Sequence, residues 1–272
     1  MASLAGVRAK IEHAKQHFEQ VNTIVRDYVA KQDRAEEVAE HEFQNDGQLI
    51  VRAKVPEPPD PRLPLVVGDC VHNLRSALDH LVLQLADLEG KANDAENKTD
   101  FPICLDARDF ENAVRRKVMP FISQTALKAI ENYQPFSQID PATNTPLADR
   151  SILWVLSKLD IIDKHRVILA ASQTVGVEGI EINGATGGPL KALFPTREIT
   201  WKPLGADTEI IRFDLSKEVR RPLNIRVRFA TGIRFVDTGL YCDGRGVQST
   251  LNNCQQSVTQ IVGYFGKQFF GE

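Results

Sequence analysis

The chain has 272 residues and a formal net charge of −3, with 42% hydrophobic and 25% charged residues. This composition is typical of a globular protein with one large domain or two small ones. The small negative charge excludes a global electrostatic attraction to nucleic acid or to an anionic membrane. No apolar run reaches the roughly 18 residues that a membrane helix requires, so we expect no membrane contact.

The four cysteines do not form a CxxC pair, so we expect no structural zinc site. They are Cys70, Cys104, Cys242 and Cys254. Reduced thiols in a cytoplasm are the simplest interpretation, and a disulfide between two of them stays an open alternative.

The first third of the chain predicts a helix and a hairpin. Apolar residues recur every three or four positions over 3–33, which places them on one face of a long helix. Residues 40–55 contain the turn signal Asn45-Asp46-Gly47 before an alternating apolar segment, a pattern typical of a β-hairpin. A proline-rich connector follows and excludes a helix between residues 56 and 64.

The middle of the chain predicts further helices. The stripe of the second helix, 65–89, is Val67, Val71, Leu74, Leu78, Leu81 and Leu85. Residues 91–99 read as a polar loop, and 135–146 as another loop. Between these loops we predict two short helices, at 109–118 and 123–133, and a longer helix follows at 149–166.

The C-terminal half predicts strands and then a last helix. Strands are expected at 167–171, 177–182, 209–215 and 224–235, the last of which alternates apolar residues with arginines. The glycine-rich residues 184–188 read as a turn, because no Lys-Ser/Thr pair follows as in a phosphate loop. The three-four apolar spacing returns over 247–269 and predicts the closing helix.

These elements predict an α+β protein. Its core is a four-helix bundle of residues 3–33, 65–89, 149–166 and 247–269, with a sheet from 40–55 and 167–237. A helix with one apolar stripe must bury it against partners, and four such helices favour a bundle. The first and last helices need the same partners, so we expect a single domain over 1–272.

The second helix carries an unusual set of polar residues beside its stripe. His72, Arg75 and Asp79 lie along one flank, and Asp69, Asn73, Ser76 and His80 lie round the back. Most of these residue types are poorer helix formers than Glu or Lys, which indicates that something other than helix propensity selects them. Two interpretations stay open: a functional site, or a second buried face that hydrogen-bonds to neighbouring backbone.

The segment Asp160 to Arg166 repeats this chemistry and includes His165. On a helix, Asp163 projects close to the apolar direction, which is costly for a carboxylate unless it is paired. We predict that Asp163 joins His72 and Arg75 in one polar cluster, with Arg75 as a bidentate partner. The structural interpretation is a clamp between helices, and the functional one is an active site.

A metal site has the required residue types but not the required spacing. Asp69, His72, Asp79, His80, Asp163 and His165 are suitable ligands, yet no two of them form an HxxxH, HExxH or ExxH pair on one helix. We therefore expect neither a metal nor another cofactor.

The pattern Arg-x4-His, formed by Arg75 and His80, resembles the catalytic motif of HEPN-domain ribonucleases. That resemblance implies a helical protein that acts on RNA across a homodimer, with the histidine as acid or base and the arginine on the phosphate. We take Arg75, His80 and His72 as candidate catalytic residues. Asp69, Asn73, Asp79, Asp163 and His165 form the expected structural polar cluster around them.

The segments GD-x-x-HNLRSALDHL (68–81), Phe-Pro-Ile (101–103) and D-x-x-DKHR (160–166) together resemble a group of uncharacterised bacterial proteins. This resemblance implies a bacterial cytosolic protein and no particular activity. The favoured hypothesis is an RNA-directed, endoribonuclease-type protein of a toxin or defence system. The alternative is a non-catalytic ligand-binding or assembly protein whose buried polar cluster is structural.

The end of the chain carries a cluster of aromatic residues within 264–270. Aromatic clusters at a chain end are usually covered, so we expect a homodimer. The competing interpretation is that these side chains dock on the sheet of their own chain.

Overall fold

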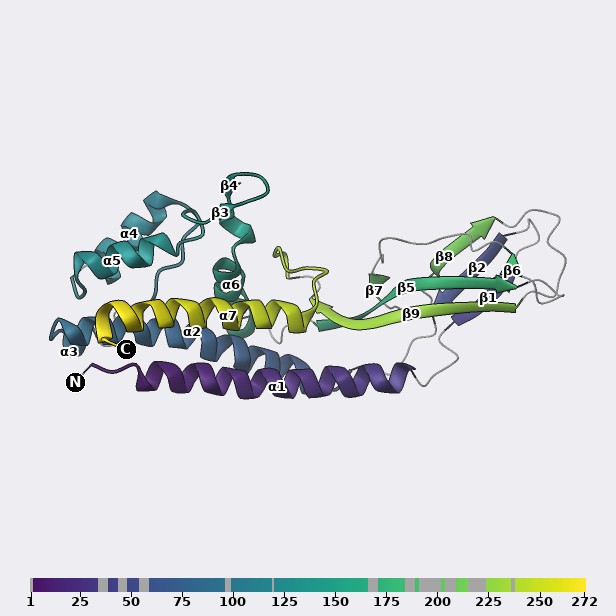
Figure 1. The fold of residues 1–272 in the computed structure, drawn as a ribbon, viewed down its shortest axis with the longest axis horizontal. Coiled ribbons are helices and arrows are strands. Elements are labelled where there is room, and N and C mark those ends of the chain that lie inside the picture. Colours follow the sequence, from purple (N-terminus) through teal and green to yellow (C-terminus); the bar gives the residue numbers. More distant parts are fainter. Residues whose placement is uncertain are drawn as a thin grey trace. The chain divides into compact units, whose positions relative to one another are not determined.

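The computed structural model describes residues 2–33, 39–43, 48–53, 59–95, 99–118, 120–165, 171–183, 189–190, 202–203, 209–214, 224–235 and 238–272. Its contacts divide the chain into two compact units. The first contains Met1–Asn22, Arg62–Ala170 and Phe235–Glu272, and the second contains Thr23–Pro61 and Ala171–Arg234. The single domain over 1–272 stays a prediction. The described chain is α+β (Figure 1).

The first unit is built on long helices, the first of which continues past Asn22 into the second unit. They are α1 (Ala5–Asp33), α2 (Leu63–Leu88), α6 (Ile152–His165) and α7 (Val247–Phe265). α2 contacts both α6 and α7, which also contact each other. Hydrogen bonds attach α1 to its neighbours, from Gln248 to Asn22 and between the side chains of His13 and Asn73. Every stripe residue predicted for α2 is buried, as the hydrophobic effect requires.

Shorter elements complete the first unit. They are α3 (Ala92–Ala95), α4 (Ala107–Lys117), α5 (Gln124–Asn132), strands β3 (Ile139–Asp140) and β4 (Thr145–Pro146), and the 3-10 turn η1 (Ala148–Arg150). α4 and α5 begin where side chains cap them: Asp106 accepts from the Asp109 N–H, and Ser123 from the Ala126 N–H.

Five segments differ from the prediction. α2 begins at Leu63, inside the connector expected to exclude a helix up to residue 64, because proline is tolerated in the first turn of a helix. The segments 91–99 and 135–146, expected as loops, contain the single turn α3 and the short β3–β4 pair. The helix expected from residue 149 begins at Ile152, because Ser151 has extended backbone dihedrals and separates it from η1. The last α-helix ends at Phe265 and continues as the π-helical turn η2 (Gly266–Phe270).

The strands of the second unit form two sheets rather than the one expected. The predicted hairpin is confirmed: β1 (Ala39–Phe43) pairs antiparallel with β2 (Gln48–Ala53), with Ala39 opposite Ala53. The other edge of β2 pairs antiparallel with β8 (Glu209–Asp214). The edge of the hairpin therefore takes a strand from the C-terminal half of the chain.

The other sheet is organised around β5 (Ala171–Asn183). This strand pairs with β6 (Pro189–Leu190), β7 (Lys202–Pro203) and β9 (Asn224–Phe235). β9 has the predicted bounds, whereas β5 starts earlier than the predicted residue 177. The predicted strand residues 167–170, the hairpin turn and the glycine-rich turn lie outside the described residues. Among the described residues, no helix is long and apolar enough to cross a bilayer.

Candidate functional site

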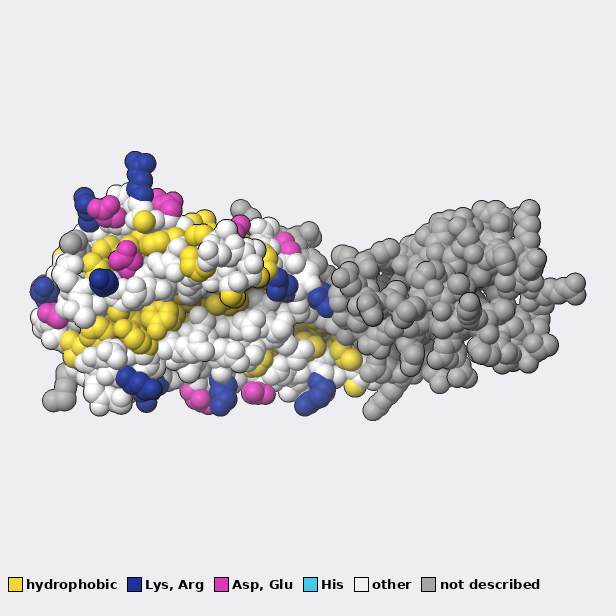
Figure 2. All heavy atoms as spheres, turned by 45° about the horizontal axis from the view of Figure 1, so that its top comes forward, with side chains coloured by type: hydrophobic (Ala, Val, Ile, Leu, Met, Phe, Trp, Pro, Cys, Tyr) yellow, Lys and Arg dark blue, Asp and Glu magenta, His cyan; other side chains and the backbone are white. Residues whose placement is uncertain are grey.

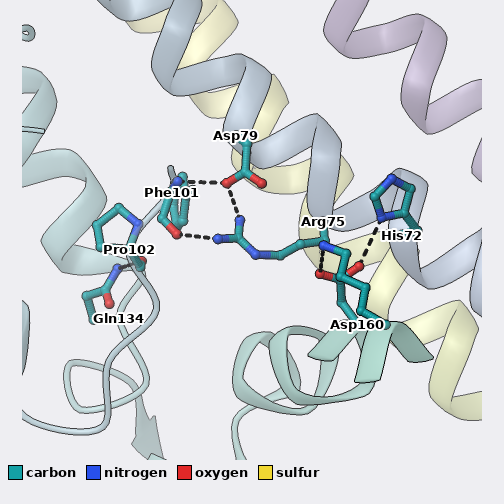
Figure 3. A network of polar contacts seen from close by, with 8 residues as sticks. His72, Arg75, Asp79, Phe101, Pro102, Gln134 and Asp160 are labelled. Carbon is teal, nitrogen blue, oxygen red and sulfur yellow. Dashed lines mark hydrogen bonds and ion pairs between the residues drawn. The ribbon is translucent and has the colours of Figure 1, made fainter. Parts of the chain in front are cut away.

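The polar flank of α2 is divided between two separate sets of contacts. Arg75 and Asp79 face the irregular segment that contains Phe101, whereas His72 faces α6 (Figure 3). The two sets lie on successive turns of the same helix. The expectation of a single polar cluster is therefore replaced by two, with different partners.

The first set holds the backbone of Phe101. Arg75 Nη1 donates to Asp79 Oδ1 at 2.6 Å, and Arg75 Nη2 donates to the Phe101 carbonyl at 2.8 Å. Asp79 Oδ1 also accepts from the Phe101 N–H at 2.8 Å. The Arg75 side chain is only 11% exposed, so its guanidinium makes these contacts in the interior of the protein. We call Arg75, Asp79 and the Phe101 backbone the arginine lock.

Electrostatics and burial oppose each other at Asp79. Burial raises the pKa of its carboxyl above the ordinary value, while Arg75 and the Phe101 N–H lower it and Asp100 raises it further. The charged hydrogen bonds of the arginine lock therefore offset part of the cost of removing this carboxylate from water.

Gln134, just after the end of α5, holds the same segment through further hydrogen bonds. Its amide nitrogen donates to the Pro102 carbonyl at 2.8 Å and to the Ile130 carbonyl at 3.2 Å. Its amide oxygen accepts from the Cys104 N–H at 3.0 Å. The side chain is buried, so the Phe-Pro-Ile segment is held from both sides through its backbone.

The second set joins α2 to α6. His72 Nδ1 lies 3.1 Å from Asp160 Oδ1, and Lys164 Nζ donates to Asp160 Oδ2 at 2.7 Å. The Asp160 side chain is 6% exposed, whereas that of His72 is 50% exposed. A buried carboxylate thus orients a half-exposed imidazole, and we call these two residues the His–Asp pair.

Asp163 lies one helical turn beyond Asp160 and approaches α2 at Gly68. A Cβ atom built on Gly68 would lie 2.3 Å from Asp163 Oδ1, so only glycine leaves room for this carboxyl. Burial raises the pKa of Asp163, and the nearby Asp160 and Asp69 raise it further, while His72 and Lys164 lower it. The predicted inward direction of Asp163 therefore places it against the backbone of the neighbouring helix.

The predicted pair between Arg75 and Asp163 is wrong. The Arg75 side chain reaches one turn toward the C-terminus of α2, to Asp79, and then to Phe101. The charges that act most strongly on Asp163 are those of Asp160, Asp69, His72 and Lys164. Asp79 lies four residues after Arg75 on the same helix, and this spacing places the two side chains next to each other.

The remaining predicted residues are dispersed. Asn73 is buried, donates to the Asp69 carbonyl at 2.8 Å and faces His13 of α1. His80 and Asp69 are exposed, and the side chain of His165 lies outside the described residues. Asp79 belongs to the arginine lock and not to the surroundings of Asp163.

Asp160 and Gln134 are the important residues that the sequence interpretation missed. Asp160 could have been found, because it lies one turn after the buried Leu156 and beside the buried Leu159. Gln134 follows the end of α5, where no periodic pattern indicates burial.

Neither a thiol site nor a metal site emerges from the described residues. All four cysteines are free thiols, and burial raises the pKa of Cys70 to about 12, which keeps it protonated and unreactive. Across the described ranges, no group of three or more His, Cys, Asp or Glu residues is arranged to hold a metal ion.

Comparison with known proteins adds no assignment at this point. The chain matches no protein-family model, no curated protein and no solved structure.

Proposed function

We propose that the His–Asp pair is a proton-transfer centre, and that the protein is an RNA-directed enzyme of the endoribonuclease type. The observation that carries this proposal is the half-exposed His72 ring with its Nδ1 on the buried Asp160 carboxylate. A carboxylate at Nδ1 favours the tautomer with a proton there and leaves the Nε2 lone pair to act as a base.

RNA suits such a centre because its own 2′-hydroxyl is the nucleophile. Cleavage then needs one group that accepts the hydroxyl proton and one that supplies a proton to the leaving oxygen, and it needs no cofactor.

The proposal assigns the chemistry to His72 rather than to Arg75 and His80. Arg75 is engaged in the arginine lock, so its guanidinium serves the position of α2 and Phe101. His80 is exposed and lies about 12 Å further along the helix axis from His72, too far for both rings to act on one phosphodiester.

An RNase assay with matched variants tests this proposal. Purified protein is incubated with a fluorophore-labelled single-stranded RNA in the presence of EDTA. We expect His72→Ala to abolish cleavage, Asp160→Asn to reduce it by about a hundredfold or more, and His80→Ala to leave it within a few-fold. The products should carry 2′,3′-cyclic phosphate and 5′-hydroxyl ends. Equal cleavage by wild type and His72→Ala would refute the assignment.

A second candidate is a non-catalytic ligand-binding or assembly protein whose polar residues are structural. The arginine lock favours it, because Arg75 and Asp79 are bound to each other and to backbone. In that case wild type cleaves no RNA, and both Arg75→Ala and His72→Ala lower the denaturation midpoint.

We further propose that the protein is a cytoplasmic homodimer. The free thiols support the location. Exposed apolar side chains support self-association: Tyr264 is 38% and Leu65 is 55% exposed, and Figure 2 shows hydrophobic side chains at the surface of the helical unit. The C-terminal aromatics are partly covered by their own chain, since Tyr133, just after α5, contacts the rings of Tyr264 and Phe265.

A further inference from the structure

Two pairs of residues face each other across the contact between α2 and α6. His72 lies opposite Asp160, at 3.1 Å, and one turn away Gly68 lies opposite Asp163. Gly68 and His72 are four positions apart on α2, and Asp160 and Asp163 are three apart on α6, so both pairs lie on the same faces of their helices. The carboxyl of Asp163 is thereby brought beside the His–Asp pair.

The two carboxyls of α6 have different surroundings. Asp160 accepts from Lys164 and contacts His72, so both of its oxygens are occupied. Within the described residues Asp163 makes no hydrogen bond or ion pair. The charged groups that act on it are Asp160, Asp69, His72 and Lys164, and the two carboxylates among them disfavour its ionised form.

We propose that Asp163 is the second proton-transfer residue of this site and acts as the acid opposite His72. The inference rests on the proposed function. Acid–base pairs in enzymes are commonly two titratable groups whose environments stabilise opposite protonation states, and the surroundings of Asp160 and Asp163 differ in this way. Gly68 is then a positioning residue, because it provides the space in which the Asp163 carboxyl lies.

The step balances without a further reactant. The 2′-oxygen of the RNA attacks the adjacent phosphorus while its proton passes to His72 Nε2. The bond from phosphorus to the 5′-oxygen breaks, and that oxygen takes the proton of the Asp163 carboxyl. The products are a 2′,3′-cyclic phosphate and a free 5′-hydroxyl. Proton return from His72 to Asp163 through solvent restores the starting state.

Asp163→Asn is the main test, because it keeps the shape of the side chain and removes the transferable proton. We expect kcat to fall about a hundredfold. The wild-type rate should decline at high pH as Asp163 loses its proton, and this alkaline limb should disappear from the residual activity of the variant. Gly68→Ala, which displaces the carboxyl and leaves the His72 side chain intact, should lower kcat as well.

The outcomes separate this inference from the proposed function. If His72→Ala abolishes cleavage while Asp163→Asn keeps the wild-type rate and pH profile, the role of Asp163 is wrong and the function of His72 stands. An alkaline limb that persists unchanged in Asp163→Asn would also refute the inference. A wild-type protein that cleaves no RNA overturns the proposed function and this role together.

Discussion

At the scale of single residues, the polar side chains of α2 differ in how many of their polar atoms already contact a partner. Arg75 and Asp79 direct their charged atoms to each other and to the backbone N–H and carbonyl of Phe101. His72 uses one ring nitrogen and remains half exposed. A chemical role is therefore argued for His72 and a structural role for Arg75, although both residue types are common in active sites.

Removing the guanidinium of the arginine lock should be costly. Arg75→Met keeps much of the side-chain volume but leaves the Asp79 carboxylate without its cation and the Phe101 carbonyl without a donor. We expect a loss of roughly 2–4 kcal/mol in the free energy of unfolding, measured by urea denaturation. Arg115, which is exposed and pairs with Glu111 on α4, provides the control, and Arg115→Met should cost less than about 1 kcal/mol.

Substitution of Asp163 should raise the stability of the fold, whereas Arg75→Met should lower it. Its pKa is higher in the folded protein than the ordinary value, so ionisation destabilises the fold, and any stabilisation from its protonated form is lost as pH rises through the folded pKa. We expect Asp163→Asn to have a higher urea midpoint than wild type at neutral pH. The difference should vanish in acid, below the ordinary pKa of aspartate. A lower midpoint at neutral pH would show that the ionised carboxylate is stabilised.

Asp69 provides a test of electrostatics at the proposed substrate site. It is exposed, and its charge acts on Asp163 beside His72. A carboxylate here repels phosphate, so Asp69→Asn should tighten RNA binding severalfold at low salt, with a smaller effect at high salt. Fluorescence anisotropy with labelled RNA measures the dissociation constant, and Asp87→Asn near the end of α2 is the control. An unchanged constant would place the RNA away from Asp69.

At the scale of elements, hydrophobic spacing predicts the individual helices and strands. It does not predict the contacts between segments that are distant in the sequence. The apolar stripes of α2 and α7 and the alternation of β9 lie within single segments, so the sequence alone indicates them. The partner of Arg75 could not be predicted, because Phe101 lies 26 positions away in a segment without periodic pattern. The same limit hid the pairing of β2 with β8, which depends on the path of the whole chain.

Gln134 tests how far one side chain supports the segment between α2 and α4. Gln134→Ala would leave the Cys104 N–H and the Pro102 carbonyl without their side-chain partner. Because the amide is buried, we expect a loss of about 2–3 kcal/mol in thermal or urea unfolding. Gln124→Ala, at an exposed position of α5, should change stability by less than about 0.5 kcal/mol. Equal effects would show that water replaces the Gln134 amide.

At the scale of the whole molecule, the chain enters and leaves each unit more than once. The expected single domain makes a sharp prediction, because the chain has two tryptophans, Trp154 in the first unit and Trp201 in the range of the second. Trp201→Phe and Trp154→Phe each leave one fluorescent reporter. One cooperative domain requires the same urea midpoint from both variants once their own stability changes are calibrated by circular dichroism. Two separate transitions would assign each unit its own folding reaction.

The arginine lock has a consequence for how α2 recognises the rest of the chain. Phe101 both donates its N–H and offers its carbonyl, as a residue does when it faces an antiparallel neighbour in a sheet. Asp79 and Arg75 supply the complementary acceptor and donor, so one turn of a helix imitates the edge of a strand. These contacts involve only backbone atoms of Phe101, so they do not select its side chain. The identity of residue 101 is instead determined by the buried core that its side chain enters.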